Sequence, residues 1–134
     1  MIFIDTGAYL RRFLKTDQYH SRSAAAWNLL KEQLEPCYTS NFVLDETITF
    51  LARRAGYSFA AQRALQLYTS NELHILRPLL EDELTAINVF EKFADQEVSF
   101  TACVSFGLMQ KAEIKRVFSF DRHFERAGFE LWPA

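Results

Sequence analysis

Short apolar runs alternate with longer segments of helical periodicity along this 134-residue chain. The apolar runs are rich in β-branched and aromatic residues, a composition typical of buried strands. They lie at residues 2–4, 37–39, 73–76, 116–120 and 129–132. Strands that alternate with helices in this way predict an α/β fold, a three-layer α/β/α sandwich around a central, mainly parallel sheet.

The helices between these strands are predicted from apolar residues that recur every three or four positions and from residues that cap helix ends. Ser40 or Asn41 begins one helix, and Gly56 stops it after Ala55. Ser99 is predicted to cap another, which extends to about Met109. Further helices are expected over about 22–34, 58–68 and 81–93. Since no linker or repeat interrupts the pattern, we expect residues 1–134 to form a single domain.

Composition limits the classes of function. The chain is 49% hydrophobic with 13 phenylalanines, which predicts an aromatic-rich core. Its net charge of −2 is not that of a general nucleic-acid binder, so any contact with nucleic acid must use a local patch. No run of eighteen apolar residues predicts a membrane span. The first residues also lack the basic and apolar regions of a signal peptide.

Two cysteines and three histidines show no metal-binding spacing. Cys37 and Cys103 both lie in apolar surroundings, and we interpret them as buried thiols in a reducing compartment. Together with the absence of a signal peptide, this predicts a cytoplasmic protein. The histidines (His20, His74 and His123) are interpreted as structural or surface residues.

Acidic residues follow two of the predicted strands directly. Asp5 ends the first strand, and Asp121 follows the run from Val117 to Phe120. Either residue alone is often a turn or cap residue. In an open α/β sheet, however, ligands bind outside the carboxyl ends of the strands, so two such acids share one edge.

Two more acids lie near predicted helix ends, and both are weaker candidates. Glu46 near a helix start usually complements the helix dipole, and Asp95 caps a loop equally well. Grouped with Asp5 and Asp121, they form an acidic cluster that needs a cation. Oxygen-only ligation favours Mg²⁺ or Mn²⁺. Such an ion activates a water and stabilises charge during phosphodiester hydrolysis.

Two other functions of Asp5 fit the sequence less well. Residues 5–7 spell the Asp-Thr-Gly of aspartic proteases, but those enzymes are nearly all-β and this chain is predicted to be mostly helical. A phosphoacceptor receiver domain would need paired acids near Asp5, which lies between Ile4 and Thr6. Phosphorylation of Asp5 by a small phosphodonor would support that reading.

Four segments, in order and spacing, resemble a PIN-domain protein, and more narrowly a VapC-type toxin ribonuclease. They are FIDTG at 3–7, TSNFVLDE at 39–46, DQEVSFTAC at 95–103, and FSFDRHF at 118–124 followed by Gly128 and Phe129. The resemblance covers essentially the whole chain. It implies an α/β/α fold, a Mg²⁺- or Mn²⁺-dependent endoribonuclease that cleaves RNA, a homodimer, and neutralisation by a cognate antitoxin protein.

The resemblance also implies roles for individual residues. Asp5, Glu46 and Asp121 match the family's catalytic and metal-binding acids, Asp95 a secondary acid, and Ser119 a hydroxyl beside the last acid. Ala102 departs from the pattern, because the family usually has a metal-binding Asp there. If Ser99 is the N-cap, Ala102 is the third helical residue and offers neither oxygen nor charge.

The alanine therefore predicts weakened metal binding and reduced cleavage. The change is either engineered or natural, and the intact remainder of the motif favours a recent or deliberate one. The alternative function is a catalytically inactive PIN-fold module that binds RNA or protein.

Several basic groups are candidates for contact with RNA. Arg11 and Arg122 follow Asp5 and Asp121 closely in the sequence and are the preferred phosphate contacts. Ser119 is a further candidate substrate-binding residue. The others, interpreted mostly as solvated helix faces, are Arg12, Arg53, Arg54, Lys111, Lys115, Arg116 and Arg126. Apolar surface for partners is expected near Tyr9 to Leu14 and Trp27 to Leu30.

Overall fold

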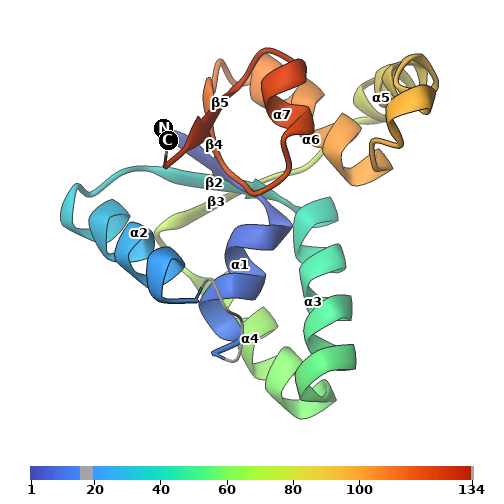
Figure 1. The fold of residues 1–134 in the computed structure, drawn as a ribbon. Helices are drawn as coiled ribbons and strands as arrows, with labels where there is room; N and C mark the ends of the chain where they lie inside the picture. Colours follow the sequence, from blue (N-terminus) through green and yellow to red (C-terminus); the bar gives the residue numbers. More distant parts are fainter. Residues whose placement is uncertain (16–19, 134) are drawn as a thin grey trace.

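Five parallel strands form one sheet at the centre of the molecule, in the order β3-β2-β1-β4-β5 (Figure 1). The structure is a computed structural model, and it describes residues 1–15 and 20–133. The strands are β1 (Ile2–Ile4), β2 (Cys37–Ser40), β3 (Leu73–Leu76), β4 (Arg116–Phe118) and β5 (Glu130–Trp132). The predicted α/β sandwich is confirmed, and the sheet is parallel throughout.

Helices cover both faces of this sheet. In Figure 1, α1 and α2 lie on one side of the sheet, and α6 and α7 lie on the other. The described helices are α1 (Thr6–Phe13), α2 (His20–Glu32), α3 (Asn41–Ala55), α4 (Tyr57–Thr69), α5 (Leu80–Lys92), the short 3-10 helix η1 (Ala94–Gln96), α6 (Phe100–Lys111) and α7 (His123–Arg126). None of them is long and apolar enough to cross a membrane.

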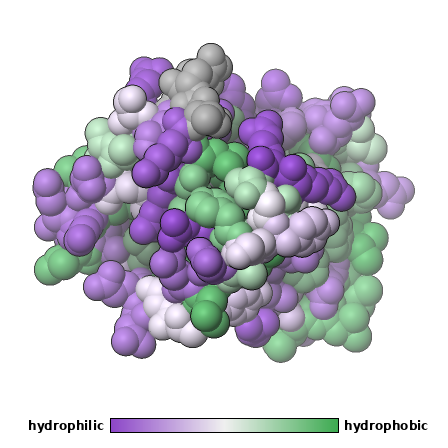
Figure 2. All heavy atoms as spheres, turned by 90° about the horizontal axis from the view of Figure 1, so that it is seen from below, coloured by the Kyte–Doolittle hydropathy of each residue, from purple (hydrophilic) through white to green (hydrophobic). Residues whose placement is uncertain are grey.

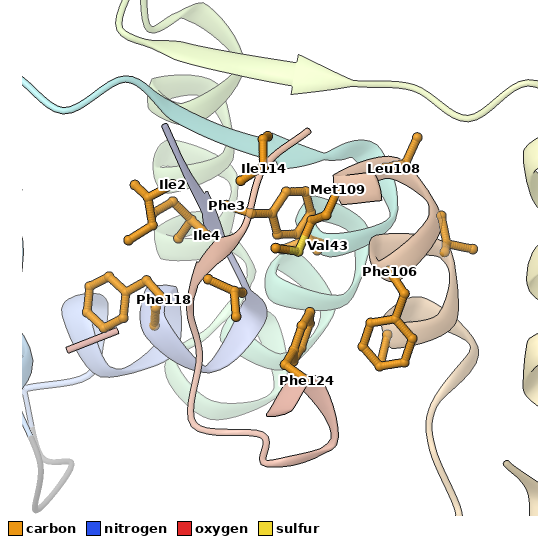
Figure 3. Packing of buried hydrophobic residues seen from close by; sticks show 14 of the residues in the cluster. Ile2, Phe3, Ile4, Val43, Phe106, Leu108, Met109, Ile114, Phe118 and Phe124 are labelled. Atoms are coloured by element: carbon orange, nitrogen blue, oxygen red, sulfur yellow. The ribbon is translucent and has the colours of Figure 1, made fainter. Parts of the chain in front are cut away.

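The core between sheet and helices is aromatic-rich, as the composition predicts. Phe118 of β4 is fully buried, with ring centroids 5.2 Å from Trp27 and 5.3 Å from Trp132. On the other face, Phe124 meets Phe106 edge-on at 5.0 Å (Figure 3). Burying rings of this size supplies much of the driving force for folding.

The capping signals predicted for α3 are used, whereas α4 begins at Tyr57 with Gly56 as its N-cap and is not capped by Ser58. The Ser40 hydroxyl accepts a hydrogen bond from the Val43 N–H at 3.1 Å and caps α3. Gly56 ends α3 with φ of +94°, a conformation that favours glycine. The expected helix over 22–34 is displaced in the structure, where α2 runs from His20 to Glu32. Leu34, at φ +51°, lies beyond the helix end.

Two short helices and one strand end differ from the sequence expectation. Helix α1 and the four-residue α7 were not expected, since both are too short to show a clear period. The strand expected over 116–120 ends at Phe118. Ser119 lies beyond the strand end, where its hydroxyl donates a hydrogen bond to the Asp5 carboxylate and accepts one from the Asp121 backbone N–H.

The expected apolar surface is present only in part. Tyr9, Leu14 and Leu30 are buried, whereas Leu29 is exposed. Large exposed apolar residues are also found on α5 and the segment before it, and on α4, including Leu79, Leu80, Leu84, Ile87, Phe90, Leu65, Tyr68 and Tyr57. Cys103 is buried as predicted, whereas Cys37 is only partly buried, and both thiols are free.

Candidate active site

The carboxyl edge of the sheet collects the polar residues that the sequence singled out. Asp5 follows β1, and Ser119 follows β4, its hydrogen-bonded neighbour. On the other side of β1, β2 ends at Ser40, where α3 begins. Parallel strands end at the same edge, so three loops converge there.

Asp5 is a buried carboxyl group, 9% exposed. Ser119 Oγ donates a hydrogen bond of 2.7 Å to Asp5 Oδ2. Burial raises the pKa of Asp5 to about 6, opposed by the Ser119 bond and assisted by the charges of Asp121 and Glu46. Although Asp5 is the N-cap of α1, its side chain makes no capping hydrogen bond. Its placement is therefore not explained by helix capping.

Asp121 is held beside Asp5 through the same serine. The Asp121 backbone N–H donates to Ser119 Oγ at 3.0 Å, so one hydroxyl joins both acids. The His123 backbone N–H donates to Asp121 Oδ1 at 2.9 Å, and His123 Nδ1 lies 2.7 Å from the same oxygen. This last contact is an ion pair whenever the imidazole is protonated.

The role of His123 was missed by the sequence interpretation. The signal was available, because an aspartate often accepts a hydrogen bond from the backbone two residues further on. The residue after next is here a histidine, whose ring returns to the same carboxylate. His123 therefore orients Asp121.

The other two predicted acids differ from each other. Glu46 is half-buried in the second turn of α3, and its charge is one of those that raise the pKa of Asp5. Asp95 lies exposed in η1, between α5 and α6. No described interaction joins Asp95 to Asp5. The structure thus places Asp5, Glu46 and Asp121 at one edge of the sheet. Asp95 makes no described interaction with these three acids.

Ala102 takes the position predicted for it. Ser99 caps α6, and its hydroxyl accepts from the Ala102 N–H at 3.1 Å, which makes Ala102 the third helical residue. Its side chain is 3% exposed. The rings of Phe42 and Phe100, at the first turns of α3 and α6, lie 6.0 Å apart. The start of α6 therefore lies beside the start of α3, the helix that carries Glu46.

The predicted substrate contacts have three different surroundings. The Arg11 guanidinium lies 3.6 Å from the centre of the Phe120 ring, next to Gly7, where a Cβ would come within 3.2 Å of Nη1. Arg122 is exposed and pairs with Glu125 at 3.1 Å. The hydroxyl of Ser119 is committed to Asp5 and Asp121. Of the two arginines, Arg11 is the one that packs against Phe120, which lies between Ser119 and Asp121 in the chain.

The carboxylate oxygens of Asp5, Glu46 and Asp121 are ligands of the kind that a hard divalent cation prefers. The charges of Glu46 and Asp121 oppose ionisation of Asp5, and a bound cation would remove that opposition. Over residues 1–15 and 20–133, no three acidic, histidine or cysteine side chains lie close enough to form a ready metal site.

The family of the chain follows from comparison with known proteins. The model of the PIN domain family matches residues 2–130. The chain therefore belongs to the PIN domain family, and the resemblance stated from its motifs is confirmed.

Individual proteins give more specific matches than the family does. The chain is 32% identical over 130 residues to the 23S rRNA-specific endonuclease VapC20 of Mycobacterium tuberculosis, covering 96% of this chain and 95% of that protein. The crystal structure of VapC20, described as a sarcin–ricin loop cleaving toxin, superposes with a TM-score of 0.86 at 29% identity and covers 96% of each chain. FitAcB from Neisseria gonorrhoeae shares the fold alone, with a TM-score of 0.68 at 16% identity over 98% of this chain and 96% of that one.

Proposed function

We propose that this protein is a metal-dependent endoribonuclease of the VapC toxin type, neutralised by a cognate antitoxin protein. The observation that carries the proposal is the buried Asp5 carboxyl group, joined to Asp121 by Ser119 and exposed to the charge of Glu46. A buried acid with a raised pKa, with other acids beside it at a sheet edge, is typical of a catalytic site rather than of a structural cap. Homology to VapC20, which acts on 23S rRNA, supports RNA as substrate.

Asp5, Glu46 and Asp121 are the residues that would hold Mg²⁺ or Mn²⁺. When bound, such an ion lowers the pKa of a water and stabilises charge on the phosphate. Ser119 donates a hydrogen bond to the Asp5 carboxylate, and His123 contacts that of Asp121, so each carboxylate has a neighbour that restricts its orientation. Arg11 and Arg122 are the proposed contacts to substrate phosphate, with Ser119 beside them, and Asp95 is at most an accessory acid.

The activity of this particular chain is proposed to be impaired by Ala102. An Asp at the third position of α6 would lie at the positive end of the helix dipole and beside the helix of Glu46. Alanine leaves three acids to hold the cation. The second candidate function, an inactive PIN-fold module that binds RNA or protein, rests on this substitution alone.

The proposed partners are an antitoxin and a second copy of the chain, in the cytoplasm where RNA is found. The exposed apolar residues of α4 and α5 include Leu65, Leu80 and Leu84, at 66%, 71% and 54% exposure. Apolar groups gathered in this way typically mark a protein interface. We propose that residues 1–134 act as a single PIN domain with these helices as its contact surface.

The test is cleavage of an RNA oligonucleotide containing the 23S rRNA sarcin–ricin loop, with Mg²⁺ and with Mn²⁺. We expect Ala102→Asp to raise the cleavage rate by about two orders of magnitude, the usual effect of one electrostatic group in an active site. Ala102→Asn is the matched control, because it adds the same volume without the charge.

Two outcomes would correct the proposal. If Ala102→Asp cleaves no RNA with any divalent metal, the nuclease assignment fails and the binding module stands. If the unchanged chain cleaves as fast as Ala102→Asp, then Asp5, Glu46 and Asp121 suffice and the proposed impairment is wrong.

A further inference from the structure

The far end of α1 borders a pocket that the acidic edge does not include. The pocket has a volume of about 630 Å³ and lies between the ends of α1 and α3 and the side of α4. Of the described residues that line it, four are basic (Arg12, Lys15, Arg54 and Arg63) and none is acidic. Seen from below, the molecule shows hydrophobic residues at the centre of the face and hydrophilic residues around them (Figure 2).

The apolar residues of the pocket belong to a packed cluster. Leu14, Leu51, Ala52 and Ala60 form a small buried cluster, separate from the main core, against which Phe13 and Phe59 pack. Leu14, Phe13 and Phe59 also line the pocket. It combines an apolar base with a basic rim.

Two arginines are held against aromatic rings beside this pocket. The Arg63 guanidinium lies 4.9 Å from the centre of Phe59 and 5.8 Å from Phe13. That of Arg12 lies 4.6 Å from Trp27 and 5.3 Å from Phe13. Stacking of this kind restricts each guanidinium plane, so less rotamer entropy is lost when a ligand binds.

These arginines lack a charge partner in the parts of the chain that the structure describes. Arg63 donates to Gln66 Oε1 at 2.8 Å, a neutral acceptor, and its buried Nε has no hydrogen-bond partner. None of the ion pairs among the described residues includes Arg12, Lys15, Arg54 or Arg63. Although much of Arg12 is exposed, partial burial lowers its pKa, and the nearby charge of Arg63 lowers it further.

We propose that this pocket binds the phosphate backbone of the RNA substrate, beside the segment that is cleaved. The proposal rests on the proposed ribonuclease function. Paired, ring-stacked guanidinium groups suit a phosphate, which accepts two parallel hydrogen bonds from each arginine. RNA is favoured over an acidic protein because one helix connects the pocket to the acidic edge. From Asp5 to Arg12 the helix rises only about 10 Å.

The candidates for phosphate contact elsewhere are less available. Lys111 pairs with Asp82, Arg116 with Glu35, and Arg122 with Glu125. Arg126 donates to Gln96. Since the chain carries a net charge of −2, RNA needs a local concentration of unpaired positive charge. The pocket supplies such a concentration within reach of the acids.

The experiment measures binding of a single-stranded RNA oligonucleotide without divalent metal, so that cleavage does not contribute. We expect Arg12→Gln/Arg63→Gln to weaken binding at least tenfold. Losing two phosphate contacts should also reduce the slope of log K against log salt by about 1.4. The matched control is Lys31→Gln/Lys92→Gln, which removes the same charge from exposed positions on α2 and α5. Arg54→Gln is a milder pocket variant, because Arg54 is exposed.

The outcomes separate this proposal from the ribonuclease assignment. If the pocket variant and the control variant bind RNA equally well, the proposed RNA site in the pocket is wrong. If Ala102→Asp still cleaves RNA when it also carries the pocket substitutions, the ribonuclease assignment holds even though the pocket proposal fails. No RNA binding by the unchanged chain overturns the pocket as an RNA site. If the pocket variants lose binding to a polyglutamate peptide but not to RNA, the occupant is an acidic protein and the proposal is wrong. Circular dichroism establishes that each variant is folded.

Discussion

The two ends of helix α1 carry opposite charge: Asp5 lies at its start and Arg12 near its end. At its start, Asp5 is buried with Asp121 and Glu46 nearby, and its pKa is raised. At its end, Arg12 lies against Trp27 with Arg63 nearby, and its pKa is lowered. Each shift opposes the charged form, because like charges are gathered in partly desolvated surroundings. The comparison teaches that a small net charge of −2 is compatible with two oppositely charged regions, an acidic one suited to a cation and a basic one suited to an anion.

The dipole of α1 agrees with this distribution, since acids are favoured at a helix start and bases at its end. That contribution is a fraction of a kcal/mol at exposed positions, so it does not offset burial. In the folded protein without ligands, the charged forms of Asp5 and Arg12 are therefore both destabilised. Ligands of opposite charge, a divalent cation at one end and phosphate at the other, would relieve both.

The largest expected effect separates two neighbouring acids of α3. In the Ala102→Asp background, Glu46→Gln should lower RNA cleavage by about two orders of magnitude, because it removes one of the charges proposed to hold the cation. Asp45→Asn is the control, since Asp45 is exposed and should change the rate less than about twofold. If the two variants cleave RNA at equal rates, the proposed role of Glu46 in holding the cation is wrong.

Asp5→Asn should stabilise the protein near neutral pH. Ionising Asp5 is harder in the folded protein, where its pKa is about 6, than in the unfolded chain, where it is 3.8. The folded state therefore loses stability as the pH rises from about 4 to 6, by about 3 kcal/mol at most. Chemical denaturation without divalent metal should show Asp5→Asn more stable at pH 8 and no gain at pH 3.5.

Asp95→Asn is the control for that series, because Asp95 is exposed and should show no comparable gain. If Asp5→Asn is less stable than the unchanged chain at pH 8, the carboxylate is stabilised in the metal-free protein. The acidic edge would then need no cation, and the contrast between the two ends of α1 would fail.

Ser119→Ala should weaken the acidic edge without removing an acid. The hydroxyl favours ionised Asp5, so its loss should raise the pKa of Asp5 and move the pH profile of cleavage by Ala102→Asp upward. Loss of a residue that orients a ligand typically lowers metal affinity about tenfold or more. Ser105→Ala removes another buried hydroxyl, bonded to the Thr101 carbonyl, and should leave the profile unchanged.

Much of this contrast was predictable from the sequence, but not all of it. Asp5 and Asp121 were identified because a strand end is a local feature, and Ser99 placed Ala102 correctly as the third residue of α6. The pairing of His123 with Asp121 and the exposure of Asp95 depend on how α7 and η1 turn, and such short elements show little periodicity. The basic pocket was missed because Arg12, Arg54 and Arg63 come from three helices whose approach depends on packing.

The smallest effect tests the basic end alone. Phosphate that binds only the folded protein stabilises it by about 1 kcal/mol when its concentration is five times its Kd. For a domain of this size, that shifts the melting temperature by about 3–4 °C. We therefore expect phosphate, against chloride at equal ionic strength and without divalent metal, to raise the melting temperature of the unchanged chain and of Lys31→Gln/Lys92→Gln. Arg12→Gln/Arg63→Gln should show no such rise, since its pocket no longer presents the paired guanidinium groups. An equal rise in all three proteins would mean that phosphate acts through general exclusion from the surface, and the end of α1 would then be only a solvated basic face.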